Sequence, residues 1–579
     1  MKFLNHQSTM SSHLLLVVLI LCNTLSHGSF NSIYNSFVNC LTTKSITQKD
    51  ISQIVYSTNN PLFNPILQTY IRNRRFFNFT TSKPVLIVTP SKEFQVSSIV
   101  LCTKESDLQL KIRSGGHDYE GISYISNVPF IMLDMFNLRE IYMDVYAETA
   151  WVQAGATVGE LYYNIWTKSN LLGFPAGVCH TVGVGGHVSG GGYGNMLRKF
   201  GLSVDNVLDA RLVDVNGRIL DRKSMGEDLF WAIKGGGGAS FGVILAFKIR
   251  LVRVPETVTY FRVERFLDNQ NVIDVVVQWQ NVASKIDNDL FIRLLIQPIT
   301  TKHENKTKGA RNTKTIRATF IALFLGDSSR LMSLINNELP ALGLIKQDCF
   351  EMSWIDSVLR WASFVNTTKP ISLLNRTGDP SHFLKRKSDY VHEPISRDGL
   401  DSIFKKVISL EKVAIVFNPY GGRMAEIHED ETPFPHRESV LFKIQYAVNW
   451  DEEGVVIGKE HLSHIRDMYN FMTPYVSSNP REAYLNYRDL DIGTNDHGKN
   501  SLEEGRIYGT KYFKNNFDRL VKVKSAVDPT NFFRNEQSIP TQTHSFGKEN
   551  KGSCFTISSV LVLGECLILT SIIFFLVCS

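Results

Sequence analysis

The stretch Gly177–Gly194, GVCHTVGVGGHVSGGGYG, restricts the fold more than any other part of this chain. It places seven glycines between Gly183 and Gly194, and Cys179 stands just before them. Glycine loses more conformational entropy on folding than any other residue, so such a cluster indicates positive φ angles or a group that approaches the main chain closely. The segment is therefore either a flexible linker or part of a ligand-binding surface.

Two further glycine-rich segments occur, RSGGHDYEG at Arg113–Gly121 and KGGGG at Lys234–Gly238. No window satisfies G-x-G-x-x-G or G-x-x-x-x-G-K-[ST], so neither a Rossmann nor a P-loop site is supported. Glycine turns can also aim successive N–H groups at an anion. The three segments together predict a concave site for a pyrophosphate and an attached ring system, although tight turns alone would explain any one of them. Spacing by itself assigns no chemical role to His117 or Cys179.

The length of 579 residues predicts at least two domains, and a net charge of +6 over that length gives no case for a nucleic-acid partner. Residues 1–28, with an apolar run at Leu14–Leu21 and small residues before Gly28, predict a signal peptide; a buried N-terminal helix is the less favoured alternative. Secretion agrees with the four glycosylation sequons, at Asn78, Asn305, Asn366 and Asn375.

The cysteines and the C-terminal tail also bear on location. In an oxidising compartment one or two disulfides are expected, and Cys40–Cys102 is the favoured pair. The tail, 541–579, is a polar linker followed by residues 554–579, which are apolar except for Glu565. It fits a membrane span or a lipid-anchor signal, and a charge inside a span would be costly. Membrane attachment through the tail and release of the chain therefore stay equally open.

The pattern of apolar residues predicts an α+β fold. Up to Val254, short strands alternate with glycine turns and helices, among them a helix over 91–106, a capping box at Thr157 and Glu160, and a hairpin at Asn216-Gly217. Residues 255–480 alternate more cleanly and predict an antiparallel sheet with helices on one face. The segment 481–540 contains polar loops and one helix over 505–527. We expect it to return to the first domain, 29–254, and to close the active site.

Several long strings closely resemble one known family. They are RSGGHDYEGISY, TVGVGGHVSGGGYG, GEDLFWAIKGGGGASFGV, TPFPHR, YLNYRDLDIG and DPTNFFRNEQSIP. They resemble the plant berberine bridge enzyme-like flavoproteins of the vanillyl-alcohol-oxidase superfamily, and the cannabinoid-forming oxidocyclases are especially similar. The resemblance covers residues 32–540. It implies a two-domain flavoprotein with an FAD-binding domain at 29–254 and a substrate-binding domain at 255–480.

The resemblance also implies an FAD held by two covalent bonds, from His117 to the flavin 8α carbon and from Cys179 to flavin C6. His187 would stabilise negative charge near the pyrimidine end of the reduced ring. No metal is expected. The residues implied to bind the cofactor are Arg113, Ser114, Gly115, Gly116, His117, Cys179, Gly183, Gly185, Gly186, His187, Ser189, Gly242, Val243 and Asn486.

The strand SVLFKIQYAVNW, residues 439–450, places Lys443 and Gln445 on one face. Spacing alone would let them face water, but the resemblance implies that this strand forms the floor of the substrate pocket. Ring-forming relatives carry glutamate at the position of Lys443. The group similar to monolignol and carbohydrate oxidases carries lysine there, glutamine two residues later, and tyrosines matching Tyr193 and Tyr487. All four are present here.

Catalytic roles follow from this match. Tyrosine has an unperturbed pKa of about 10, and a nearby cation lowers it. Tyr193 is therefore expected to be the base and Lys443 its tuning cation, with Gln445 and Tyr487 as orienting donors. An exchange of roles between Tyr193 and Tyr487 stays open.

We therefore expect a secreted oxidase of the apoplast or cell wall. It would act on an allylic alcohol of monolignol type or on a carbohydrate C1 hydroxyl, with O2 reduced to H2O2. Val182 matches a position that resembles an oxygen gate, where valine admits O2 and leucine excludes it. The alternatives are a dehydrogenase, an oxidative cyclase of a specialised metabolite, and a non-catalytic wall or membrane-tethered protein. The partners would be a small-molecule substrate and O2.

Overall fold

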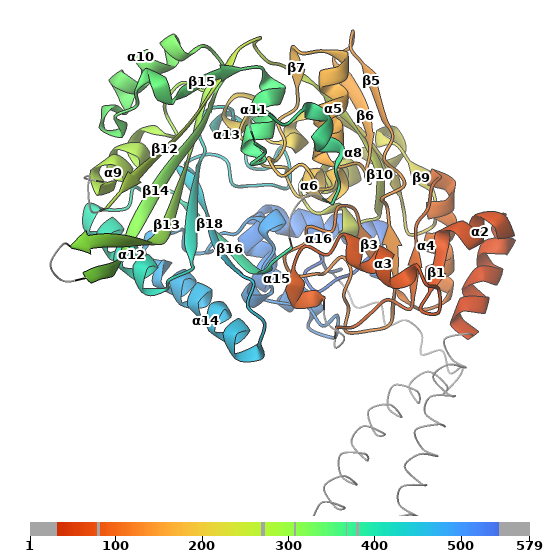
Figure 1. Ribbon diagram of the computed structural model, residues 1–579. Coiled ribbons are helices and arrows are strands. Elements are labelled where there is room, and N and C mark those ends of the chain that lie inside the picture. Colours follow the sequence, from red (N-terminus) through yellow and green to blue (C-terminus); the bar gives the residue numbers. More distant parts are fainter. Residues whose placement is uncertain are drawn as a thin grey trace, which may run out of the picture.

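The computed structural model describes residues 32–77, 81–267, 272–305, 309–365, 367–377 and 381–542, without the side chains of 302–313 (Figure 1). The predicted signal peptide and nearly all of the C-terminal tail lie outside these residues, as do Asn78 and Asn366 and the side chain of Asn305. In the part of the chain that is described, no helix is long and apolar enough to span a bilayer.

Two sheets support the glycine-rich segments. In the first, β2, β4 and β3 run parallel and β1 pairs with β2 in the antiparallel direction. Its central strands are apolar and buried on both faces, as parallel strands usually are. The strands in spatial order are β1 (Val55–Ser57), β2 (Leu86–Val88), β4 (Phe130–Asp134) and β3 (Gln109–Arg113). The second sheet is antiparallel, in the order β5 (Ile141–Asp144), β6 (Thr149–Gln153), β10 (Val243–Arg250), β8 (Val207–Val213) and β9 (Ile219–Leu220).

Local signals in this half of the chain are confirmed. The predicted helix over 91–106 is α4 (Glu93–Glu105). At the start of α5 (Val158–Lys168), the Thr157 hydroxyl accepts from the Glu160 N–H, and the Glu160 carboxylate accepts from the Thr157 N–H. This is the reciprocal arrangement that satisfies two exposed helix donors.

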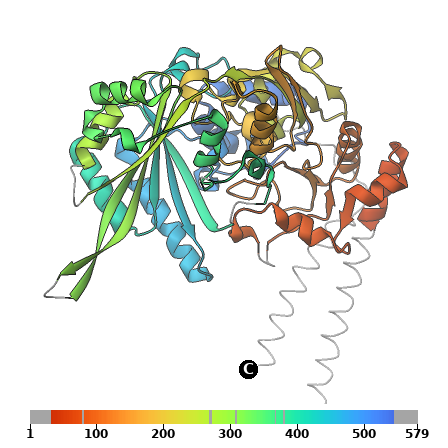
Figure 2. The ribbon, with the colours of Figure 1, turned by 45° about the horizontal axis from the view of Figure 1, so that its top comes forward.

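A seven-stranded antiparallel sheet forms the second half of the molecule, so the expected α+β class is confirmed. Its strands in spatial order are β15 (Cys349–Met352), β12 (Val258–Phe266), β14 (Gly309–Phe324), β13 (Leu290–Asn305), β17 (Ala414–Pro419), β18 (Phe442–Trp450) and β16 (Phe383–Val391). The helices α9 (Val272–Val282), α12 (Arg397–Ser409) and α14 (Val455–Phe471) pack on one face of this sheet and bury one apolar core with it (Figure 1). Figure 2 shows the β13–β14 hairpin projecting past the rest of the sheet.

The single helix predicted over 505–527 is wrong. The chain forms α15 (Ser501–Phe513) and α16 (Asn516–Val527), because Lys514 between them adopts φ 48°. In a continuous helix Gly509 and Phe517 would lie about 12 Å apart along the axis. The turn instead lays the Phe517 ring on Gly509, where any side chain would collide with it. The folded-back α16 reaches the first half of the chain, and the Lys524 ammonium donates to the Ser240 carbonyl over 2.7 Å.

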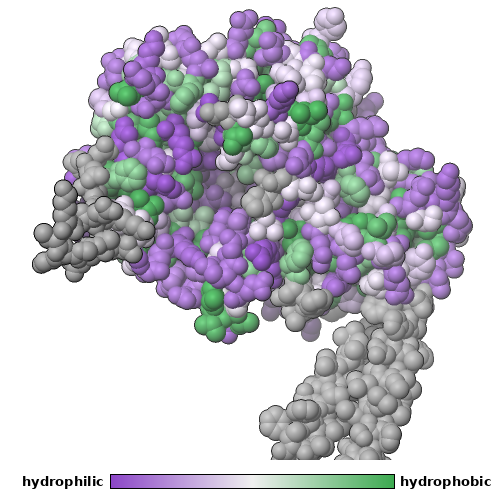
Figure 3. Space-filling view, in the orientation of Figure 1, coloured by the Kyte–Doolittle hydropathy of each residue, from purple (hydrophilic) through white to green (hydrophobic). Residues whose placement is uncertain are grey.

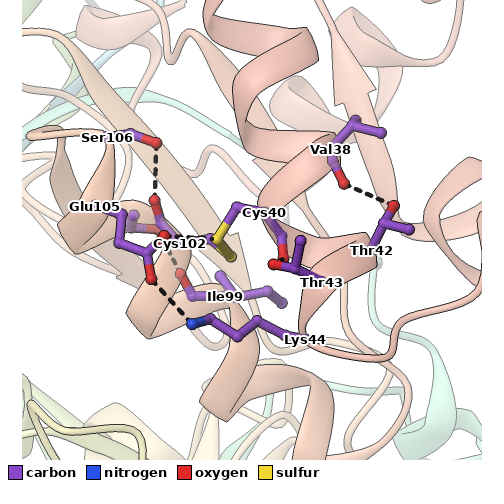
Figure 4. The surroundings of a disulfide bond; sticks show 10 residues. Val38, Cys40, Thr42, Thr43, Lys44, Ile99, Cys102, Glu105 and Ser106 are labelled. Atoms are coloured by element: carbon purple, nitrogen blue, oxygen red, sulfur yellow. Dashed lines mark hydrogen bonds and ion pairs between the residues drawn. A yellow bond between two sulfur atoms is a disulfide. The ribbon is translucent and has the colours of Figure 1, made fainter.

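The predicted disulfide joins Cys40, in the helical segment 32–43, to Cys102 in α4 (Figure 4). Lys44 and Glu105 add an ion pair of 3.0 Å between the same two segments. The N-terminal segment is thereby attached covalently to the first sheet's helix.

Replacing both Cys40 and Cys102 with alanine should lower the free energy of unfolding by about 4 kcal/mol. The bond closes a loop whose ends are 62 residues apart, and its removal restores the entropy of that loop to the unfolded chain. Denaturant unfolding followed by fluorescence measures the loss. The control is Cys349→Ala, at a cysteine that forms no disulfide. Equal stability of the double variant and the wild type would contradict the assignment.

Candidate active site

One cavity of about 330 Å³ brings the three glycine-rich segments together. The molecule is hollowed near the centre of the face drawn in Figure 3. The residues that the family resemblance implies and that do line the cavity are Ser114, Gly115, Gly116, His117, Cys179, Gly183, Gly185, Gly186, His187, Ser189, Gly242 and Asn486.

Arg113 and Val243, also expected to bind the cofactor, do not line the cavity. The Arg113 guanidinium is fully buried beneath the loop, where it binds the Asp134 carboxylate at 2.5 Å and two backbone carbonyls. Val243 begins β10, and strand alternation turns it into the apolar core while its neighbours Gly242 and Ile244 face the cavity.

The glycines fall into two groups. Gly115 and Gly183 hold two loops together, because a Cβ on Gly115 would collide with the backbone nitrogen of Gly183, and a Cβ on Gly183 with the Gly115 nitrogen. Gly186 is different, since a Cβ there would meet no protein atom within 4 Å and would project into open space at the cavity wall. A flat ligand can therefore lie directly against the main chain at Gly186, and the cavity fits the FAD that the resemblance implies.

Both residues expected to attach the flavin face this cavity. His117 Nε2 lies 2.7 Å from the hydroxyl of Thr181, and the Cys179 side chain is exposed. Val182, at the expected oxygen gate, lines the same space. The structure therefore brings His117, Cys179 and Val182 together around one cavity.

His187 is held as a neutral imidazole. Its Nε2 accepts a hydrogen bond of 3.0 Å from the Gly177 N–H, which leaves the proton on Nδ1. Burial, with the nearby Lys443, lowers the pKa of His187 to about 4. The Asn486 amide donates to the His187 carbonyl over 2.9 Å and so fixes the main chain at this point.

Lys443 lies inside a cage of three aromatic rings. Its ammonium nitrogen is 3.7 Å from the ring centroid of Tyr193, 4.1 Å from that of Tyr484 and 4.2 Å from that of Tyr487. Among the described residues it has no hydrogen-bond partner. Burial, and then the neighbouring Arg293, lowers the pKa of Lys443 well below its ordinary value. The ring faces are thus the principal stabilisation that this cation receives.

The hydroxyl of Tyr193 has partners that the sequence did not reveal. It donates to Asn418 Oδ1 over 2.6 Å, and Arg293 donates to the same oxygen over 2.8 Å and approaches the Tyr193 hydroxyl at 3.4 Å. Burial raises the pKa of Tyr193, and Arg293 opposes that rise. A charged residue within the apolar run LFIRLLI of β13 is the signal that could have identified Arg293.

Gln445 and Tyr487 both contact Tyr119. The Gln445 amide donates to the Tyr119 hydroxyl over 3.2 Å, and the Tyr119 and Tyr487 rings are 5.9 Å apart. Tyr119, Tyr193 and Tyr487 line the cavity, whereas Lys443 and Gln445 lie behind their rings. The four predicted catalytic residues are therefore neighbours, but only the two tyrosines can touch a ligand in the cavity.

Comparison with known proteins agrees with this site. Residues 84–222 match a model described as an FAD binding domain, and residues 483–540 match one described as berberine and berberine like. The Arabidopsis thaliana protein named berberine bridge enzyme-like 21 is 58% identical over 529 residues, which cover 91% of this chain and 96% of that protein.

Solved structures give the same picture. Phl p 4, a grass pollen allergen with glucose dehydrogenase activity, is 40% identical with a TM-score of 0.81, over 87% of this chain and 99% of that one. An isoleucine-to-valine variant of Phl p 4, described as a glucose oxidase, matches with the same identity and TM-score, over 88% of this chain and 99% of that one. The chain described here belongs to the berberine bridge enzyme-like family of FAD-linked oxidoreductases.

Proposed function

We propose that this protein is an oxidase of alcohols that carries FAD covalently attached through His117 and Cys179. The substrate class is an allylic alcohol of monolignol type or a carbohydrate C1 hydroxyl. The flavin would supply the acceptor for the substrate hydride and, after that, the reductant for O2. The observation that carries the proposal is that Tyr193 and Tyr487 line the same cavity as His117 and Cys179.

The side chains around the cavity support a proton transfer to Tyr193. An alcohol that loses hydride must also lose its hydroxyl proton, and the acceptor must lie within hydrogen-bond reach. Arg293, at 3.4 Å from the Tyr193 oxygen, would stabilise its phenolate, while Lys443 acts on the ring face. His187 presents an Nδ1–H donor that would stabilise negative charge in the cavity.

The relatives support the substrate class and the acceptor only by likeness. The glucose dehydrogenase activity of Phl p 4 favours a carbohydrate hydroxyl as the group oxidised. The glucose oxidase that results from its isoleucine-to-valine change favours oxygen as the acceptor where valine stands at the gate. Val182 is the residue of this chain to which that reasoning applies. The oxidative cyclase is the rival function, and its product would contain a new ring.

Two measurements test the proposal. Acid precipitation of the purified protein should leave the yellow colour in the pellet, because the flavin is covalently bound. Anaerobic stopped-flow reduction by monolignols, oligosaccharides and prenylated phenols should then show rapid bleaching by one class alone. Free colour in the supernatant would contradict the attachment, and a flavin-free protein would favour the non-catalytic alternative.

We further propose that the protein is secreted and glycosylated, in keeping with the sequons. Asn375 is the one sequon asparagine whose side chain lies among the described residues, and it is exposed, as an acceptor site must be. Attachment to the membrane through the tail stays an alternative to release. Digestion with an N-glycosidase and fractionation of expressing tissue distinguish these outcomes.

The pH dependence of kcat/KM should show whether Arg293 lowers the pKa of Tyr193. Because burial raises the pKa of Tyr193, more of the base becomes available as pH rises, and kcat/KM should increase from neutral into alkaline pH. Arg293→Met removes a cation that opposes this rise in the pKa of Tyr193. The rising limb of the kcat/KM profile should therefore move to higher pH by about one unit or more. Arg262→Met, at an exposed arginine on β12, is the control. Superimposable profiles for the two variants would exclude this role for Arg293.

A further inference from the structure

Five charged side chains form a largely buried cluster outside the cavity lining. We call it the charge cluster, and its members are Glu120, Lys385, Lys387, Asp489 and Asp491. The lysine side chains are each 2% exposed, those of Glu120 and Asp489 are 4% exposed, and that of Asp491 is 24% exposed. Buried charges are expensive unless they are paired, so the contacts within this cluster must be maintained in the folded protein.

Lys385 is the member that joins the two sides of the cluster. Its ammonium contacts the Glu120 carboxylate directly and binds Asp489 Oδ1 at 2.6 Å. Lys387 binds Asp489 Oδ2 at 2.5 Å and Asp491 at 3.0 Å. Burial alone would lower the pKa of Lys385, but the carboxylates around it raise that pKa above its ordinary value. Lys385 is therefore charged at any pH at which the protein works.

The two carboxylates that Lys385 joins belong to segments of the active site. Glu120 directly follows Tyr119 and comes three residues after His117. Asp489 comes two residues after Tyr487. Lys385 lies on β16, where its neighbour Arg386 places its guanidinium 5.6 Å from the Tyr119 ring.

Strand β16 holds the segment 484–489 at both ends. At the start, the Tyr484 N–H donates to the hydroxyl of Ser388 over 2.9 Å. At the end, Lys385 and Lys387 bind Asp489. Asn486 and Tyr487, which line the cavity, lie between these two anchors.

We propose that Lys385 is a positioning residue of the active site. By binding Glu120 and Asp489 at once, it fixes the loop that carries His117 and Tyr119 against the segment that carries Asn486 and Tyr487. Lys385 would thereby set the contact between the Tyr119 and Tyr487 rings, whose centroids are 5.9 Å apart. This inference rests on the proposed flavin attachment at His117.

The test compares Lys385→Met with Lys387→Met in the full-length holoenzyme. Both changes remove a lysine from β16 that is equally buried and bound to Asp489, so the losses in Tm should be similar. Of these two lysines only Lys385 contacts Glu120, which Arg75 also approaches at 3.7 Å. Lys385→Met should therefore lower kcat by at least about tenfold, within the 10²-fold that a misplacement of ~1 Å costs. Of the two variants, only Lys385→Met should lower the fraction of flavin retained after acid precipitation. Lys387→Met should retain wild-type flavin content.

Glu120→Gln gives a second test that does not depend on the folding of Lys385→Met, because it keeps the size of the side chain and removes the charge. It should reproduce the loss of acid-stable flavin, and adding Lys387→Met should lower the retained fraction no further. Equal flavin retention and equal kcat in the two lysine variants, or full retention in Glu120→Gln, would overturn the inference. A wild-type protein without acid-stable flavin would instead refute the proposed function, so the two failures are distinguishable.

Discussion

Replacing Tyr193 with phenylalanine should lower the rate constant of anaerobic flavin reduction by about 10²–10⁴-fold, the contribution that a positioned general base makes. The change removes only the hydroxyl oxygen that would accept the substrate proton. The ring that covers Lys443 stays in place, so the buried ammonium keeps its aromatic cage. Stopped-flow spectroscopy at saturating substrate measures the effect, and acid precipitation should show unchanged flavin content.

Tyr487→Phe is the matched comparison, because Tyr487 also lines the cavity and also packs on Lys443. If Tyr193 is the base, Tyr487→Phe should affect KM more than the rate of reduction. If Tyr487→Phe is the variant that abolishes reduction, the roles of the two tyrosines are exchanged. Near wild-type rates in both variants would refute a tyrosine base altogether.

Replacing Val182 with leucine should slow reoxidation of the reduced flavin by O2 by about 10–200-fold. This is the factor by which one additional methylene changes selectivity in a tight apolar pocket. The Val182 side chain lines the same cavity as Cys179, so the added carbon would occupy space beside the proposed attachment residue. Anaerobic reduction by the substrate should be unchanged. Mixing the reduced enzyme with oxygenated buffer isolates the second half-reaction.

Val178→Leu is the control for volume, because Val178 also lines the cavity and lies on the other side of Cys179. It should leave the reaction with O2 within about twofold of wild type, far below the range expected at the gate. If both half-reactions slow equally in Val182→Leu, or if Val178→Leu has the larger effect on oxygen, the gate assignment fails.

Much of this architecture could be predicted from local sequence. The capping box of α5, the helix carrying Cys102 and the alternation of the large sheet depend on neighbours along the chain, and they are confirmed. The split between α15 and α16 could not be predicted, since it depends on a contact between Gly509 and Phe517 that only the turn creates. The glycine cluster also does more than line the cavity, because Gly183 allows its loop to contact the loop of Gly115.

The site was predictable where residues stand in a motif and was missed where they meet across strands. His117, Cys179 and Val182 lie in two short strings, and all three line one cavity. Asn418 and Arg293 come from β17 and β13 and reach Tyr193 only through sheet pairing, so no spacing along the chain announces them. Arg113 shows that membership of the motif does not by itself place a side chain in the cavity, because its guanidinium pairs with the buried Asp134 instead.

The backbone contact between Gly115 and Gly183 has a consequence for how such a protein can diversify. Under the proposed attachment, the interval between His117 and Cys179 depends on main-chain atoms of two loops that touch each other, and a side chain at either glycine would disturb it. The surroundings of Tyr193 are instead assembled from single replaceable side chains on β13, β17 and β18, namely Arg293, Asn418 and Lys443. If the proposed function holds, substitutions on those strands can change how Tyr193 reacts while the loops that carry His117 and Cys179 keep their contact.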